Sequence, residues 1–203
     1  MSKFPRAPTF LPLSLLTALP RLVVVAVFAV TLGLLTLSGP GGASAAAPSA
    51  SYQWLTGTGF ICEPPVSAPC PTTAMAANGD TIDIRGEGTL SVHPKSVTGG
   101  GTFTHHMTDG GSITGTWTAV SLLAFKDFGQ DAALGLPLEF RGGHALMLIQ
   151  LSVGGTPVHT GVLTIDCDLG TSPHGHPEGV RLAVQGGLNF NQKVEGADIF
   201  VRQ

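Results

Sequence analysis

Short apolar runs separated by glycine-rich turns fill the chain from Tyr52 to its last residue. In Val180–Gln185, for example, every second residue is valine or leucine. An apolar pattern of period two places one set of side chains on each face of a β-strand. The chain also contains 28 glycines in 203 residues, and glycine is unfavourable inside helices. We therefore expect an all-β domain of antiparallel strands rather than a helical one.

The strand-like runs number about eight, enough for a β-sandwich or a closed β-barrel. They are residues 52–61, 81–92, 101–108, 112–125, 144–153, 158–167, 180–185 and 198–202. Two hairpins are expected, at Asp109–Gly111 and at Gly154–Pro157, because Asp-Gly and Gly-Gly pairs supply the positive φ angles of tight turns. Glycines inside runs, such as Gly86 and Gly115, indicate bends and favour the barrel over the sandwich. The expected fold is a single antiparallel β-barrel or β-sandwich.

Residues 1–45 have the organisation of a secretory signal peptide. Basic residues precede an uncharged apolar run, Leu22–Leu37, which is followed by glycine, proline and the small residues Ala43–Ala45. A basic segment, an apolar segment and a small-residue cleavage site occur in this order in exported proteins. We divide the chain into a signal peptide (1–45), a flexible leader (46–51) and one all-β domain (52–203), in a secreted or extracytoplasmic protein.

An uncleaved hydrophobic helix is the alternative interpretation of the same segment. A membrane-spanning helix needs about 20 predominantly apolar residues, and the uncharged run here is close to that length. In that case the chain would be a membrane-anchored structural protein of the cell envelope. We expect contact with a membrane only if the helix is retained.

Three cysteines follow the leader. An exported chain can form disulfides, and the proline-rich loop between Cys62 and Cys70 allows the chain to return on itself. We predict a Cys62–Cys70 disulfide, with Cys167 as a buried thiol in a strand. A Cys62–Cys167 bridge stays open as an alternative, because connectivity does not follow from sequence.

Seven histidines are the most conspicuous polar side chains. The densest group is His174, His176 and Glu178, and imidazole nitrogens with a nearby carboxylate can chelate a metal ion. Asp168, or one of His105 and His106, could complete such a site. His105 and His106 cannot both ligate one ion from a regular strand, because successive side chains point to opposite faces.

The charge balance and the motifs limit the function classes. Ten basic and 13 acidic residues give a net charge of −3, which argues against nucleic-acid binding. Neither a nucleophile elbow nor a phosphate-binding glycine loop is present in the sequence, so no catalytic residue is assigned. The leading hypothesis is a secreted, non-catalytic domain that binds a small apolar ligand or a surface partner. The competing hypothesis is a metal-binding protein or metal-dependent enzyme that uses His174, His176 and Glu178.

The signal-peptide interpretation predicts that the exported protein begins close to Ala45. Cleavage there removes the apolar run and leaves no N-terminal anchor. Intact-mass spectrometry of the exported product tests this expectation. A product that retains Leu22–Leu37 would instead support the anchored protein.

Overall fold

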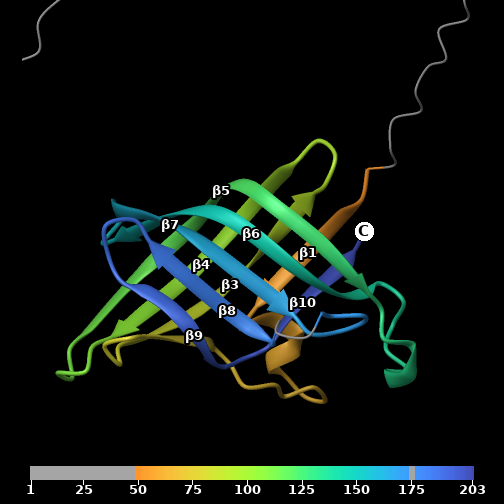
Figure 1. Cartoon of the computed structure of the whole chain (residues 1–203), viewed down its shortest axis with the longest axis horizontal. Coiled ribbons are helices and arrows are strands. Elements are labelled where there is room, and N and C mark those ends of the chain that lie inside the picture. The colour runs from red at the N-terminus through yellow and green to blue at the C-terminus, as the bar shows by residue number, and fades with distance from the viewer. Residues whose placement is uncertain (1–48, 174–176) are drawn as a thin grey trace, which may run out of the picture. The chain divides into compact units, whose positions relative to one another are not determined.

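The computed structural model of the chain describes residues 49–173 and 177–203 (Figure 1). Ten antiparallel strands form a single hydrogen-bonded sheet, accompanied by two short 3-10 helices. The strands are β1 (Ser51–Thr56), β2 (Thr72–Ala76), β3 (Thr81–Ser91), β4 (Ser96–His106), β5 (Ser112–Gly129), β6 (Phe140–Val153), β7 (Thr156–Cys167), β8 (Gly179–Val184), β9 (Asn189–Glu195) and β10 (Asp198–Arg202), and the 3-10 helices are η1 (Gly59–Cys62) and η2 (Ala132–Leu134). The prediction of an all-β domain is confirmed.

The sheet closes on itself, because each of its end strands also pairs with a strand inside it. The hydrogen-bonded order is β1-β10-β6-β5-β4-β3-β2-β9-β8-β7, with additional pairings β1–β3 and β6–β7. Strands β3 to β6 are therefore shared by two closed paths, one completed by β2, β9, β8 and β7 and the other by β1 and β10. Strand β3 changes partner along its length, since Ile84 pairs with β2 and Gly86 pairs with β1.

Both predicted hairpins are present. Strands β4 and β5 pair up to His106 and Ser112 on either side of the Asp109–Gly111 turn. Strands β6 and β7 pair across the second turn, where Gly154 and Gly155 both have positive φ. The glycine-containing turn sequences were therefore sufficient to predict which strands pair in these two hairpins.

The structure corrects the number and the limits of the strands. Ten strands form instead of about eight, because β2 and β9 were not expected. Strand β2 is short, and β9 buries a single large apolar side chain, Phe190, so neither has a strong alternating pattern. The first strand ends at Thr56 rather than at Ile61, since Gly57 and Gly59 have positive φ and lead into η1. It also begins at Ser51, one residue before the expected domain.

Two buried tryptophans lie against a glycine face of β3. The Trp54 and Trp117 rings are stacked with centroids 5.5 Å apart. A Cβ atom added to Gly86 would lie 2.4 Å from Cζ2 of Trp117, and one added to Gly88 would lie 2.6 Å from Cζ2 of Trp54. These distances are too short for a side chain, so glycine at both positions allows the indoles to approach the strand.

The predicted disulfide is present between Cys62 and Cys70. Cys167 is a free, buried cysteine at the end of β7, as expected. The alternative bridge between Cys62 and Cys167 is not formed. The predicted signal peptide lies outside the described residues. In the described part of the chain, no helix has the length and apolar character needed to cross a membrane.

Replacing Gly88 by alanine should destabilise the domain by about 3 kcal/mol, because the new methyl group would overlap packed atoms. Its Cβ would lie 2.0 Å from the carbonyl oxygen of Thr98, a backbone atom, as well as against Trp54. Denaturant unfolding of Gly88→Ala and wild type measures the difference. Glu87→Ala is the matched control, since the Glu87 side chain is exposed on the same strand. Equal losses in the two variants would contradict this account of the glycine face.

Candidate functional site

An apolar cavity of about 380 Å³ lies at the end of the sheet formed by the β4–β5, β6–β7 and β8–β9 turns. Its lining comes from β3 to β9 and from the turn after β8. Ten of the twelve lining residues are apolar or glycine, and the other two are His105 and His159. The volume falls within the range of small-molecule sites, roughly 300–1,000 Å³.

The cavity reaches solvent between two turns. Ile113, next to the β4–β5 turn, is 42% exposed, and Val158, next to the β6–β7 turn, is 45% exposed, although both line the cavity. Deeper in the cavity, Ile82, Leu151 and Phe190 are buried. These exposed side chains continue the apolar wall of the cavity to its opening, so the rim suits an apolar molecule.

His105 is held in the cavity wall by Asp80. Its Nε2 atom lies 3.0 Å from Oδ2 of Asp80, which is buried. The backbone N–H of Thr108 donates to Oδ1 of Asp80 at 3.0 Å. These hydrogen bonds, the one from Thr108 first, hold the pKa of Asp80 below its usual range. The imidazole also packs edge-on against Phe190, with ring centroids 5.3 Å apart, so its orientation is fixed.

The neighbouring His106 points to the other face of β4. Its Nε2 lies 3.0 Å from Oδ2 of Asp83, and its side chain is 48% exposed. His105, in contrast, lines the cavity. The two imidazoles therefore face opposite sides, as strand geometry predicted, and each contacts a different carboxylate.

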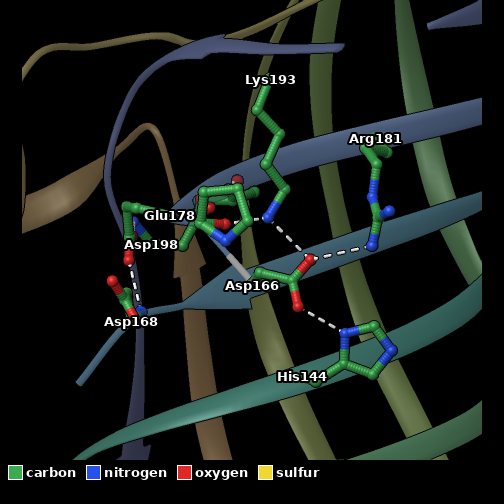
Figure 2. Close-up of polar contacts among 9 residues, drawn as sticks. His144, Asp166, Asp168, Glu178, Arg181, Lys193 and Asp198 are labelled. Atoms are coloured by element: carbon green, nitrogen blue, oxygen red, sulfur yellow. Dashed lines mark hydrogen bonds and ion pairs between the residues drawn. The ribbon is translucent and has the colours of Figure 1, made fainter. Parts of the chain in front are cut away.

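A second polar cluster surrounds Asp166 on β7 (Figure 2). Asp166 is fully buried and accepts hydrogen bonds from Lys193 at 2.8 Å, from Arg181 at 3.4 Å and from His144. Burial alone would raise the pKa of Asp166, but the hydrogen bonds from His144 and Lys193 outweigh it and hold the pKa well below its usual range. This carboxylate is therefore ionised and joins β6, β7, β8 and β9.

Two further carboxyl groups drawn in Figure 2, those of Glu178 and Asp198, have raised rather than lowered pKa values. Glu178 accepts the backbone N–H groups of Asp168 at 2.6 Å and Asp198 at 2.5 Å, yet burial raises its pKa to about 7. Burial and the nearby Glu178 raise the pKa of Asp198 well above its usual range. Hydroxyl groups of Thr56 and Thr72 donate to Asp198. This part of the cluster favours protonated carboxyls.

The predicted metal site is only partly described by the structure. His174 and His176 lie outside the described residues, and both carboxylate oxygens of Glu178 accept backbone N–H groups. Asp168 contributes its backbone N–H to Glu178. Within residues 49–173 and 177–203, no three histidine, cysteine or acidic side chains are arranged to hold a metal ion. Metal binding at His174, His176 and Glu178 stays a prediction.

Sequence reasoning missed the two pairs that organise these sites. The Asp80–His105 pair joins the residue before β3 to the end of β4, and the Asp166–Lys193 pair joins β7 to β9. The histidine was noted in the sequence, but its acidic partner is 25 residues away. The alternation around Phe103 and His105 was the one available signal that this histidine shares a face with the core.

Comparison with known proteins gave no match. No family model, curated protein or solved structure is significantly similar to this chain. The function must therefore be inferred from the site itself.

The raised pKa of Glu178 predicts a pH-dependent contribution to stability. In the folded state Glu178 keeps its proton up to about pH 7, whereas the ordinary pKa of this side chain is 4.5. The favourable contribution is therefore complete below pH 4.5 and is lost as the pH rises through about 7. Glu178→Gln cannot lose a proton, so its free energy of unfolding relative to wild type should rise by about 3 kcal/mol between pH 4.5 and 7.5.

Denaturant unfolding at several pH values measures this difference. Glu195→Gln is the control for the substitution itself, because Glu195 is an exposed glutamate on β9. A constant difference for Glu178→Gln would contradict the assignment of a raised pKa to Glu178.

Proposed function

We propose that this protein is an exported, non-catalytic β-domain that binds a small apolar ligand in the cavity beside His105. The observation that carries the proposal is the cavity itself, about 380 Å³ in volume and lined by apolar side chains apart from His105 and His159. Binding sites for small molecules combine this kind of apolar lining with a few placed polar groups. A protein without a catalytic constellation needs only such a site to act as a carrier or a sensor.

The strand pairings support a barrel rather than a sandwich for this domain. A sandwich has two separate sheets, whereas here the pairing of β6 with both β5 and β7 closes the path β6-β5-β4-β3-β2-β9-β8-β7 into a ring of eight strands. Eight-stranded barrels have interiors that are filled by side chains or hold one small ligand. Here buried apolar side chains from all ten strands form one core cluster, and the cavity lies at one end of the sheet.

The Cys62–Cys70 disulfide supports export. Disulfides persist in oxidising compartments and are rare in the cytosol, and this one closes the loop between β1 and β2. Together with the signal-like segment 1–45, it favours a secreted or extracytoplasmic protein. A ligand would then be taken up from outside the cytoplasm.

Filling the rim of the cavity should weaken ligand binding. The indole of Val158→Trp would occupy space at the opening, and we expect affinity for 2-methylnaphthalene, an apolar probe, to fall at least tenfold. Equilibrium dialysis with the full-length protein measures it. Val120→Trp is the matched control, because Val120 is 54% exposed and does not line the cavity. Equal affinity in both variants, or no saturable binding by wild type, would contradict the proposal.

A further inference from the structure

We propose that the ligand of this cavity is an apolar alcohol or phenol whose hydroxyl group donates a hydrogen bond to Nδ1 of His105. This inference rests on the proposed function and adds the chemical class of the ligand. It follows from the hydrogen-bonding capacity of three groups: the Asp80 carboxylate, the His105 imidazole and the apolar wall around them.

Asp80 determines which nitrogen of His105 carries the hydrogen. An ionised carboxylate only accepts hydrogen bonds, and Oδ1 of Asp80 already accepts the backbone N–H of Thr108. Oδ2 of Asp80 lies 3.0 Å from Nε2 of His105. Nε2 must therefore carry the hydrogen and donate it to Asp80. The hydrogen bonds that lower the pKa of Asp80 keep this carboxylate ionised.

In the neutral form of the ring, the second nitrogen then presents a lone pair. In a neutral imidazole with its hydrogen on Nε2, Nδ1 is an acceptor. The contact with Asp80 is the one hydrogen bond that the His105 ring makes within residues 49–173 and 177–203. Nδ1 is thus available to a ligand in the cavity that the ring lines.

The apolar residues around Nδ1 make this acceptor selective for a ligand that donates a hydrogen bond. Ile82, which pairs with His105 across the strands, and Phe103 and Phe190 also line the cavity, and none of their side chains can donate a hydrogen bond. A desolvated acceptor without a partner costs about 1–3 kcal/mol. His159, the other polar lining residue, is exposed and can be satisfied by water.

Among apolar ligands, a compound with a hydroxyl group provides both the apolar body and the hydrogen-bond donor that this site requires. A hydrocarbon would leave Nδ1 unsatisfied when it displaces water. A ketone, an ether or a carboxylate anion would place its own lone pairs against that of Nδ1. A hydroxyl group supplies one donor at little cost in volume, so an alcohol or phenol with an apolar body fits both the wall and the imidazole.

The test compares two probes of nearly equal shape, 2-naphthol and 2-methylnaphthalene, by equilibrium dialysis with the full-length protein at pH 8. The ratio of the 2-naphthol affinity to the 2-methylnaphthalene affinity is the quantity of interest, because hydrophobicity and the rest of the chain contribute alike in every variant. In His105→Phe, which removes the acceptor but keeps an aromatic ring, we expect this ratio to fall about tenfold.

A second variant, Asp80→Asn, tests the direction of the hydrogen bond. The asparagine oxygen would keep the Thr108 N–H, so its amide NH₂ would face Nε2 and move the imidazole hydrogen to Nδ1. His105 would then donate into the cavity. We expect 2-acetylnaphthalene, which offers only an acceptor, to bind at least threefold more tightly to Asp80→Asn than to wild type. A purely structural role of Asp80 would weaken all three probes together.

The outcomes separate the two proposals. If both probes bind wild type but their ratio is unchanged in His105→Phe, the assignment of a hydroxyl ligand is wrong and the apolar site stands. Both proposals are wrong if neither probe shows saturable binding that Val158→Trp weakens. Uniform weakening of the three probes by Asp80→Asn would also overturn the assignment to Nδ1.

Discussion

The packing of two indoles against glycine in β3 is the contact around which the sheet is organised. Trp54 comes from β1 and Trp117 from β5, and the indole N–H of Trp117 donates to the carbonyl of Arg85 at 3.1 Å. Arg85 and Gly86 mark the place where β3 exchanges β2 for β1. Truncating a buried tryptophan costs about 3–5 kcal/mol, so this pair contributes strongly to the stability of the junction between the two closed paths.

The two polar clusters, around Asp166 and around Asp80, have different roles in the domain. Asp166 is ionised and links four strands through Lys193, Arg181 and His144, and these partners offset the cost of burying its charge. Asp80 is also ionised, but it orients one imidazole toward an apolar cavity. The first arrangement surrounds a buried carboxylate with three partners from the protein, whereas the second leaves a ring nitrogen for a ligand. This difference is why the cavity, and not the larger charged cluster, supports the proposed function.

Much of the fold could be predicted from local sequence because hairpins, strand faces and a short disulfide loop depend on nearby residues. Gly110 and the Gly154–Gly155 pair marked the turns, and the opposite orientations of His105 and His106 followed from strand periodicity. Strand β9 was missed because its stability comes from neighbouring strands rather than from its own polar sequence. Because β9 was not predicted, Lys193 could not be placed beside Asp166, although it is one of three side chains that bond this carboxylate.

The sequence by itself determined the class of structure: antiparallel strands, two hairpins and the Cys62–Cys70 loop, each set by residues close in the chain. Only the tertiary structure decided how the sheet returns on itself and which distant side chains meet. Asp80 and His105 are 25 residues apart and Asp166 and Lys193 are 27 apart. Their contacts depend on strand order and register, which are selected by packing of the whole core and leave no short-range pattern in the sequence.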